Sequence, residues 1–320
     1  MALLSQMLVK ALVMALVAVP TAVVGPAGGE PTRPGPTVRP AASVSAASVS
    51  ALRDVGPRCN DPAKVLNLDD WKITLPFGRP QSGTTPLEIV QPALATYTAS
   101  PWFAVTPTCD AVLFRAPVNG VTTKGSKNPR SELREMSGHG TANASWSSTA
   151  GTHSLVVVEA FTHLPQAKPQ LVGAQIHNAD DDITVFRLEG RNLYVTDGNN
   201  AHHKLVTSDY TLGTKFEAKF VVGDGKVTAY YNGVPQTTIT QRFSGAYFKA
   251  GAYTQANCGN SAPCSSDNYG ETTIYSVTVE HHVTWWDEFW DLCRRVLPAS
   301  VVVVVLIGLV ALIWRRSRVR

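Results

Sequence analysis

The sequence predicts an all-β fold, either a sandwich or a barrel of many short strands. From Cys59 to about Glu280, runs of β-branched and aromatic residues alternate with short turn signals. This region shows no long apolar repeat of the kind that marks an amphipathic helix. The length of 320 residues leaves room for one large domain with additional terminal segments.

The strand candidates follow one another closely in the middle of the chain. We expect strands at Ser154–Phe161, Asp182–Glu189, Asn192–Thr196, Lys215–Val222 and Lys226–Tyr231. The turn signals between and after them are Glu189-Gly190, Asp197-Gly198, Asp224-Gly225 and Asn232-Gly233. Asp224-Gly225 predicts a tight hairpin, because a type I′ turn needs positive φ at both central residues.

The first 57 residues are predicted to lie outside the folded domain. Residues 1–29 resemble a secretory signal, since Lys10 precedes an apolar run from Ala11 to Val19 that is short for a membrane span. An uncleaved N-terminal anchor is the alternative. Residues 30–57 are rich in Pro, Ala, Ser and Val and lack aromatic residues, which predicts an extended linker.

Three stretches carry polar side chains at alternate positions. Alternate residues of a strand face the same side, so Arg130, Glu132 and Arg134 share one face. Gln175 and His177 likewise share a face, with Ile176 pointing the other way. In the longest stretch the polar face consists of Tyr247, Lys249, Gly251, Tyr253 and Gln255. Such a face, with Gly251 leaving space between the phenols, can hold a long polar ligand and transfer protons.

Together these stretches resemble the signature motifs of polysaccharide lyase family 7, the alginate lyases. That family shows R-[ST]-E-L-R, then Q-I-H or Q-V-H, then Y-F-K-A-G-x-Y-x-Q, matching Arg130–Arg134, Gln175–His177 and Tyr247–Gln255. Val65–Pro76 and Phe114–Gly120 also look like this family. The resemblance implies a jelly-roll sandwich of two antiparallel sheets with a concave substrate groove, which we place at residues 58–281.

The resemblance also implies a reaction, β-elimination at the 4-O-glycosidic bond of alginate. Every sugar of alginate carries a carboxylate, which Arg130 and Gln175 are predicted to neutralise. His177 is the predicted base, because its ordinary pKa lies close to neutral pH. Tyr253, the second tyrosine of its motif, is the predicted acid, with Tyr247 as the rival phenol. We expect no cofactor and no metal ion.

The remaining polar positions of the motifs are predicted to bind substrate. Glu132 either orients Arg130 and Arg134 or only balances their charge, and Arg134 either binds a neighbouring sugar or only pairs with Glu132. The predicted substrate-binding residues are Glu132, Arg134, Tyr247, Lys249, Gln255 and Lys72. Within the family, the Q-I-H form seen here, with Ile176, resembles enzymes that act on guluronate-containing blocks.

Four of the five cysteines are predicted to form disulfides, because a secreted chain favours them. Cys258 and Cys264 bracket a short loop, and we expect them to pair with each other. We also expect Cys59 to pair with Cys109, while Cys293 lies outside the domain. A zinc site is the alternative, but no CxxC or HxxxH spacing supports it.

The C-terminal region predicts a membrane anchor. Residues 298–314 contain no charge, and residues 315–320 form a basic tail suited to the cytoplasmic side. The juxtamembrane segment 282–297 contains the aromatic cluster Trp285–Trp290. We therefore expect a lyase domain outside the cell surface, held by a C-terminal membrane helix; a buried helix or strand of the domain is the alternative.

The charge and the motifs exclude some other functions. The formal charge of +4 is modest and comes partly from the tail, so nucleic acid is not an expected partner. We expect a monomer that binds alginate. A non-catalytic polyuronate-binding module and a lyase for another polyuronate, such as glucuronan, are alternatives. A glycoside hydrolase would need two carboxylates, and the motif faces supply only Glu132.

Overall fold

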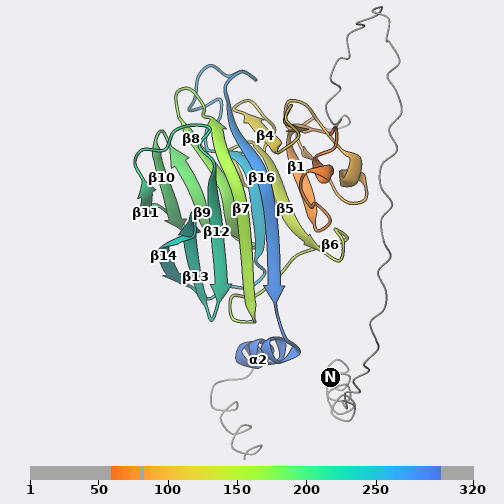
Figure 1. Cartoon of the computed structure of the whole chain (residues 1–320), viewed down its shortest axis with the longest axis vertical. Coiled ribbons are helices and arrows are strands. Elements are labelled where there is room, and N and C mark those ends of the chain that lie inside the picture. The colour runs from red at the N-terminus through yellow and green to blue at the C-terminus, as the bar shows by residue number, and fades with distance from the viewer. Residues whose placement is uncertain (1–58, 80–82, 297–320) are drawn as a thin grey trace, which may run out of the picture. The chain divides into compact units, whose positions relative to one another are not determined.

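A computed structural model describes residues 59–79 and 83–296, and they form a sandwich of two antiparallel sheets (Figure 1). The all-β prediction is thereby confirmed, with a jelly-roll-like arrangement of strands. The predicted signal, linker, membrane helix and basic tail lie outside these residues, so they stay predictions. Within the described ranges, no helix is long and apolar enough to cross a membrane.

The larger sheet has nine strands, and the three motif stretches form its centre. Its strand order is β11 (Asn200–Thr207), β10 (Asn192–Asp197), β9 (Asp182–Glu189), β8 (Gln170–His177), β15 (Tyr247–Thr254), β5 (Arg130–Ser137), β1 (Trp71–Gly78) and β2 (Pro86–Ile89), with β6 (Ala142–Asn143) paired to β5. The central strand β15 therefore has β8 on one side and β5 on the other.

The smaller sheet packs against the larger one and has seven strands. Its order is β14 (Val234–Thr240), β13 (Lys226–Tyr231), β12 (Phe216–Gly223), β7 (Thr152–His163), β16 (Tyr269–His282), β4 (Val112–Pro117) and β3 (Phe103–Val105). Two short 3-10 helices, η2 (Pro62–Lys64) and η3 (Ala93–Thr96), precede β3. The predicted strands in the middle of the chain are all found, within a few residues of their expected ends.

The hairpin between β12 and β13 has the predicted geometry. Asp224 and Gly225 both have positive φ, 53° and 70°, as a type I′ turn requires. Asn232 and Gly233 repeat this pattern, with φ of 50° and 76°, between β13 and β14. These turns fix the register of the neighbouring strands and so decide which residues face the interior.

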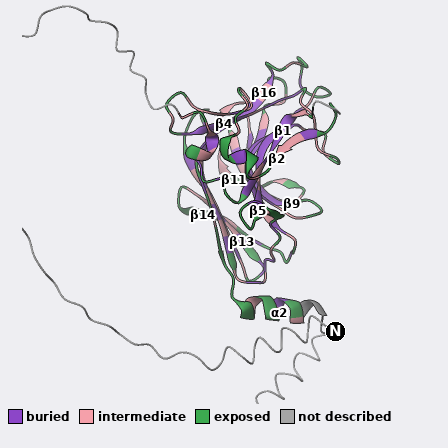
Figure 2. Cartoon of the chain, turned by 90° about the vertical axis from the view of Figure 1, so that its right-hand side faces the viewer, coloured by how far each residue is buried: buried purple, intermediate pink, exposed green. Residues whose placement is uncertain are grey.

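The space between the sheets is filled by aromatic and branched aliphatic side chains, which Figure 2 shows as the buried layer. The largest fully buried side chains include Phe114, Phe161, Phe186, Phe220 and Phe248. Phe248 comes from β15, so its neighbours Tyr247 and Lys249 must point away from this core. The apolar half of each motif thus anchors the polar half on the outer face of the larger sheet.

One carboxyl group is enclosed between the sheets. Glu159 of β7 is fully buried, and burial raises its pKa to about 8. Its Oε1 accepts one bond, from the backbone N–H of Ala174, and its Oε2 has no partner among the described residues. Gly173 makes room for it, since a Cβ there would lie 2.6 Å from both carboxyl oxygens. The group is therefore neutral in the fold at neutral pH.

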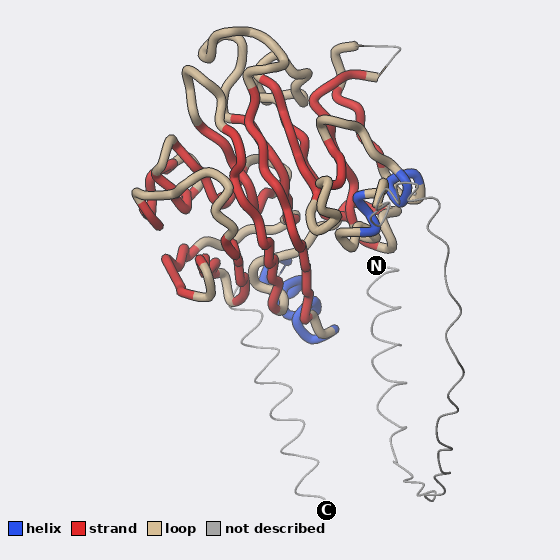
Figure 3. The backbone as a smooth tube through the Cα atoms, turned by 45° about the horizontal axis from the view of Figure 1, so that its top comes forward, coloured by secondary structure: helices blue, strands red, loops and turns tan. Residues whose placement is uncertain are grey.

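Both predicted disulfides are present, joining Cys59 to Cys109 and Cys258 to Cys264. Cys293 has no disulfide partner in the described part of the chain and lies in helix α2 (Trp285–Val296). This helix follows β16 after two residues. Figure 1 shows it beyond the ends of the strands, and in the tube of Figure 3 it is one of the few helical segments.

Candidate active site

Strand register brings the three motif stretches together on the outer face of the larger sheet. In sequence they are more than forty residues apart, yet they occupy the adjacent strands β5, β15 and β8. The aligned pairs are Tyr247 with His177, Lys249 with Gln175 and Arg134, Gly251 with Glu132, and Tyr253 with Arg130. We call these residues the catalytic row. All four predicted catalytic residues belong to it.

Glu132 is the centre of the row and is 1% exposed. Its carboxylate forms ion pairs with Arg130 and Lys249 and accepts a hydrogen bond from the side-chain amide of Gln175. Burial acts to raise the pKa of Glu132, but the charges of Lys249 and Arg130 outweigh it, and the pKa falls below its ordinary value. Glu132 is therefore an ionised organiser and cannot serve as the acid of a hydrolase.

Lys249 is buried beside this carboxylate rather than extended over the sheet. Burial, together with the nearby charge of Arg130, lowers its pKa to about 8, and Glu132 partly offsets the effect. At neutral pH most of the ammonium is still protonated. Lys249 was predicted to bind substrate. In the structure its ammonium also balances the negative charge of Glu132.

Arg130 joins Glu132 to the tyrosine at the other end of the row. Its Nη1 donates to Glu132 Oε2 at 3.1 Å, and its guanidinium lies 4.0 Å from the centre of the Tyr253 ring. Its Nε is buried and has no partner among the described residues. Arg130 thus has a donor that the described residues do not use.

His177 has the hydrogen bonding and the charge state of a base. Its Nδ1 lies 2.5 Å from the carbonyl oxygen of Asn178, which can only accept, so we assign the proton to Nδ1 and the lone pair to Nε2. Burial, followed by the charge of Lys249, lowers the pKa of His177. The imidazole is therefore neutral at neutral pH, as proton abstraction requires.

The two tyrosines of the row have different surroundings. The hydroxyl of Tyr253 lies 3.1 Å from Ser126 Oγ. The hydroxyl of Tyr247 lies 3.2 Å from His177 Nδ1, and the two rings stack with centroids 5.5 Å apart. Burial raises the pKa of Tyr247 in spite of the opposing charge of Arg134. Tyr247 is thus placed to position His177, and its raised pKa makes its phenol harder to ionise than that of an ordinary tyrosine.

Arg134 forms no ion pair with Glu132 among the described residues. The alternative in which Arg134 only pairs with Glu132 is therefore wrong. Arg134 Nη1 donates to Asn143 Oδ1 at 2.7 Å and to the carbonyl of Glu135 at 3.0 Å. The guanidinium also lies 3.8 Å from the centre of the Tyr247 ring. These contacts leave Arg134 half-buried on the outer face, where binding of a neighbouring sugar stays the prediction.

Lys72 and Gln255 lie on opposite sides of the row. Lys72 of β1 aligns with Arg134, and its ammonium pairs with Glu88 at 3.0 Å. Gln255 follows β15, and its carbonyl oxygen accepts from Arg187 Nη1 at 3.1 Å. The amide nitrogen of Gln255 is buried and has no partner among the described residues, so the contact with Arg187 fixes the orientation of the amide but leaves its donors unused.

Sequence patterns missed two residues that hold the row in place. Arg187 of β9 orients Gln255 and also donates to Gln170 Oε1 at 2.8 Å. Arg187 lies between the apolar residues Phe186 and Leu188 of β9, and an arginine in such a position was a signal that could have found it. Ser126, which contacts Tyr253, lies in a loop before β5 and carries no comparable pattern.

The sequence suggested that Gly251 leaves space between the two phenols. In the structure, Gly251 instead allows the backbones of β15 and β5 to approach closely. Its φ is +147°, and a Cβ there would lie 2.5 Å from the carbonyl oxygen of Ser131 on β5. The same Cβ would also approach Phe114, so a side chain would push β15 away from β5. The glycine therefore permits the close strand pairing that aligns Tyr253 with Arg130.

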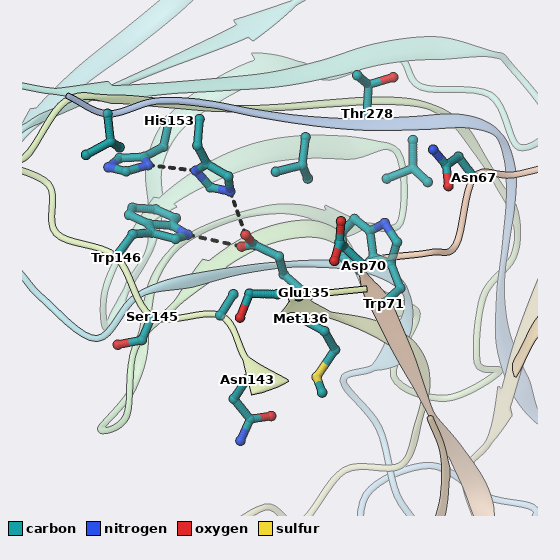
Figure 4. Close-up of a pocket in the computed structure, with 17 residues that line it drawn as sticks. Asn67, Asp70, Trp71, Glu135, Met136, Asn143, Ser145, Trp146, His153 and Thr278 are labelled. Carbon is teal, nitrogen blue, oxygen red and sulfur yellow. Dashed lines mark hydrogen bonds and ion pairs between the residues drawn. The ribbon is translucent and has the colours of Figure 1, made fainter. Parts of the chain in front are cut away.

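A separate cavity of about 540 Å³ lies at one end of β5, and Figure 4 shows the residues around it. Its lining includes neither His177 nor Tyr253. The carboxylate of Glu135 lies in it and accepts from Trp146 Nε1 at 3.0 Å and from the backbone N–H of Phe248 at 2.7 Å. Glu135 thereby joins β5 to β15 next to the row, which makes this cavity part of the supporting structure.

Comparison with known proteins gives consistent matches. The family model described as alginate lyase matches residues 66–281. An alginate lyase structure from Corynebacterium sp. is 62% identical, has a TM-score of 0.68, and aligns over 70% of this chain and 99% of that chain. Alginate lyase AlgAT5 from polysaccharide lyase family 7 is 44% identical, with a TM-score of 0.65 and coverage of 69% and 99%.

A more distant match is the marine family 7 alginate lyase AlyA1 from Zobellia galactanivorans. It is 26% identical, has a TM-score of 0.58, and aligns over 70% of this chain and 100% of that chain. No curated protein sequence matched. The aligned share of this chain is about the size of the folded domain, and the solved relatives are covered almost completely.

We expect the imidazole of His177 to titrate below its ordinary pKa of 6.5, because burial and the charge of Lys249 oppose the imidazolium. Lys249→Met removes that charge, so the pKa of His177 should rise. An NMR titration of the histidine ring resonances measures both values. Lys72→Met is the control, because Lys72 also aligns with Arg134 but lies on β1, two strands from Lys249. It should leave the pKa of His177 unchanged. A His177 that titrates at or above 6.5 would contradict this reading of the site.

Proposed function

The chain belongs to the alginate lyase family, polysaccharide lyase family 7, and we propose that it cleaves guluronate-containing blocks of alginate by β-elimination without a metal ion. The polysaccharide lyase activity follows from the family. The residue roles, the block preference and the metal-free mechanism are the proposal. The observation that carries it is the catalytic row, in which a neutral histidine and a tyrosine lie on either side of a compensated carboxylate.

Neutralising the sugar carboxylate makes the C5 proton acidic, and Arg130 and Gln175 are the residues for this task. Arg130 uses Nη1 on Glu132 and keeps its other donors. The amide nitrogen of Gln175 carries two hydrogens, of which one is given to Glu132, so the second is left for the substrate. Glu132 thus holds both donors in place before the substrate arrives.

Proton transfer then uses the two ends of the row. His177 Nε2 takes the proton from C5, the C4–O4 bond breaks, and a double bond forms between C4 and C5. The phenol of Tyr253 gives its proton to the departing O4, with Arg130 over the ring to stabilise the developing phenolate. The product is an unsaturated uronate at the new non-reducing end.

The metal-free mechanism is supported by this donor set, because arginine and amide donors perform the charge neutralisation that a cation would otherwise supply. The described residues contain no group of three or more His, Cys, Asp or Glu arranged for a metal ion. Assays in the presence of EDTA test this part directly. Loss of all activity, restored by one divalent ion, would refute it.

The preference for guluronate is supported by stereochemistry and by Ile176. In guluronate the C5 proton and O4 lie on opposite faces of the sugar, so a separate base and acid are needed, as His177 and Tyr253 provide. In mannuronate they share a face, so one tyrosine could do both. A variant of the family 7 lyase A1-II′, 25% identical to this chain, was crystallised with the product GGG.

A location at the cell surface is also proposed. It is supported by the sequence of residues 1–29, which resembles a secretory signal, and by the uncharged run 298–314. The two disulfides of the domain are typical of proteins that fold in an oxidising compartment.

Removing either proton-transfer group should abolish most turnover of alginate. His177→Ala and Tyr253→Phe should each lower kcat/KM by about 10²–10⁴-fold, the usual contribution of general acid–base catalysis. Tyr247→Phe should be milder, because this phenol contacts His177 and not the leaving oxygen. Ultraviolet absorbance of the unsaturated product measures the rate, and circular dichroism checks the fold. An inactive Tyr247→Phe beside an active Tyr253→Phe would reverse the assignment of the acid.

The purified enzyme should cleave polyguluronate faster than polymannuronate, and Ile176→Val should narrow the gap. Ile176 is fully buried in the core beneath His177, so loss of one methylene lets the strand and the imidazole shift slightly. Anti elimination depends most on that position, since His177 alone must reach the C5 proton. Initial rates on the two homopolymers measure the ratio. Val185→Ala on the neighbouring strand β9 is the control for a general loss of packing.

A further inference from the structure

Helix α2 has its apolar side turned away from the protein. Four large residues on it are exposed: Trp285 (58%), Trp286 (51%), Phe289 (44%) and Leu292 (41%). At 100° per residue they fall on one side of the helix. Figure 2 shows α2 as largely exposed beyond the buried layers of the sandwich. A helix that packed on a core would have the opposite orientation.

The side that faces the sandwich is polar. Asp291 is 6% exposed, and its Oδ1 accepts a hydrogen bond from Ser147 Oγ at 3.0 Å and a shorter one from Thr149. Asp291 lies about 60° from Glu288 and well away from the aromatic side. The sandwich therefore holds α2 through a buried carboxylate and two hydroxyls. Of the apolar side, Leu292 lies next to this contact, where it lines a small cavity with Ser147, whereas Trp285, Trp286 and Phe289 do not line that cavity.

The helix is also well formed at its start. Thr284 caps it: the Asp287 carboxylate accepts from the backbone N–H of Thr284 at 2.8 Å, while the backbone N–H of Asp287 donates to Thr284 Oγ1 at 3.3 Å. Only Val283 and Thr284 separate it from β16. The aromatic side is thus presented by a capped, clamped helix on a short connection.

The residues that follow indicate what covers this side. After α2, residues 298–314 form a run of seventeen residues without charge, and four of the last six residues are arginine. Tryptophan and phenylalanine on one face, with charged residues on the other, characterise helices that lie in the interface of a bilayer. The rings of Trp285 and Trp286 stack with centroids 3.8 Å apart. Together they form one aromatic surface, which suits the interface of a bilayer.

We propose that α2 is a membrane-surface helix that inserts Trp285, Trp286, Phe289 and Leu292 into the interface of a lipid bilayer. The bilayer covers the apolar side, and Asp291 fixes the sandwich to the other side. The lyase domain then rests directly on the membrane in one orientation instead of moving on a free tether. The catalytic row has no part in this contact.

Vesicle binding by residues 59–296 tests the proposal. We expect this part to fold on its own, because the family model spans residues 66–281 and the Corynebacterium lyase, aligned with 70% of this chain, is covered over 99% of its own length. The probe is vesicles of equal parts phosphatidylcholine and phosphatidylglycerol, with co-sedimentation and the tryptophan emission shift as readouts. We expect binding, and the Trp285→Ser/Phe289→Ser variant should bind at least about tenfold more weakly.

A matched control separates this face from general surface hydrophobicity. Leu205→Ser/Val234→Ser removes two other exposed apolar side chains, 45% and 59% exposed, from β11 and β14. It should bind vesicles like the parent. All three proteins should cleave soluble alginate oligomers equally, which shows that they are folded. Parent protein that does not bind, or an aromatic variant that binds as well as the parent, overturns the proposal.

Two other occupants of the face give different results. If the parent self-associates without lipid in analytical ultracentrifugation, and the aromatic variant is monomeric, the face is an interface between copies and the proposal fails. In the full chain, brominated phospholipid should quench the fluorescence of Trp285 and Trp286. The Trp285→Phe/Trp286→Phe variant should therefore show less quenching than the parent. If no quenching is lost, residues 298–314 cover the face instead, and the proposal is wrong.

Discussion

A single buried carboxylate, that of Glu132, holds the catalytic row together. It lies at the junction of β8, β15 and β5 and interacts with one residue from each strand: Gln175, Lys249 and Arg130. An ionised group at 1% exposure is tolerated only when it is fully compensated. Loss of one partner from such a pair typically costs about 3–5 kcal/mol, so the register of the three strands and the charge balance of the site depend on each other.

The same contacts determine the chemistry on either side of Glu132. Lys249 compensates the carboxylate and also lowers the pKa of His177, which keeps that imidazole neutral. Arg130, the second cation, lies over the ring of Tyr253, and its Nε has no partner among the described residues. One group of interacting charges therefore lies next to the proposed base, the proposed acid and the proposed site for the sugar carboxylate. Glu135 and Gly251 support it by joining β5 to β15 closely.

Alternation in the sequence was enough to predict which side of each motif faces outward. Ile176, Leu133 and Phe248 are fully buried, as period-two patterns require, and the hairpin at Asp224 has the backbone that its residues demand. Alternation also predicted Arg130 as a partner of Glu132, but it could not predict Lys249 and Gln175. They depend on register between strands that are distant in sequence, including an irregularity between Lys249 and Tyr253 on the β8 side. Arg187 and Ser126 act through such tertiary contacts too, and no local pattern encodes those.

Three buried carboxyl groups show how the neighbours of a buried acid determine its role in this fold. Glu132 is surrounded by cations and its pKa falls, whereas Glu159 receives a single backbone bond and its pKa rises to about 8. Asp291 receives two hydroxyl bonds and holds α2 against the sandwich. Burial is common to all three, so the partners alone determine whether the group organises catalysis, stays neutral inside the core, or fastens a helix. In the catalytic row the cations Arg130 and Lys249 outnumber the buried anion Glu132, and an excess of positive charge is what the proposed binding of an anionic polymer requires.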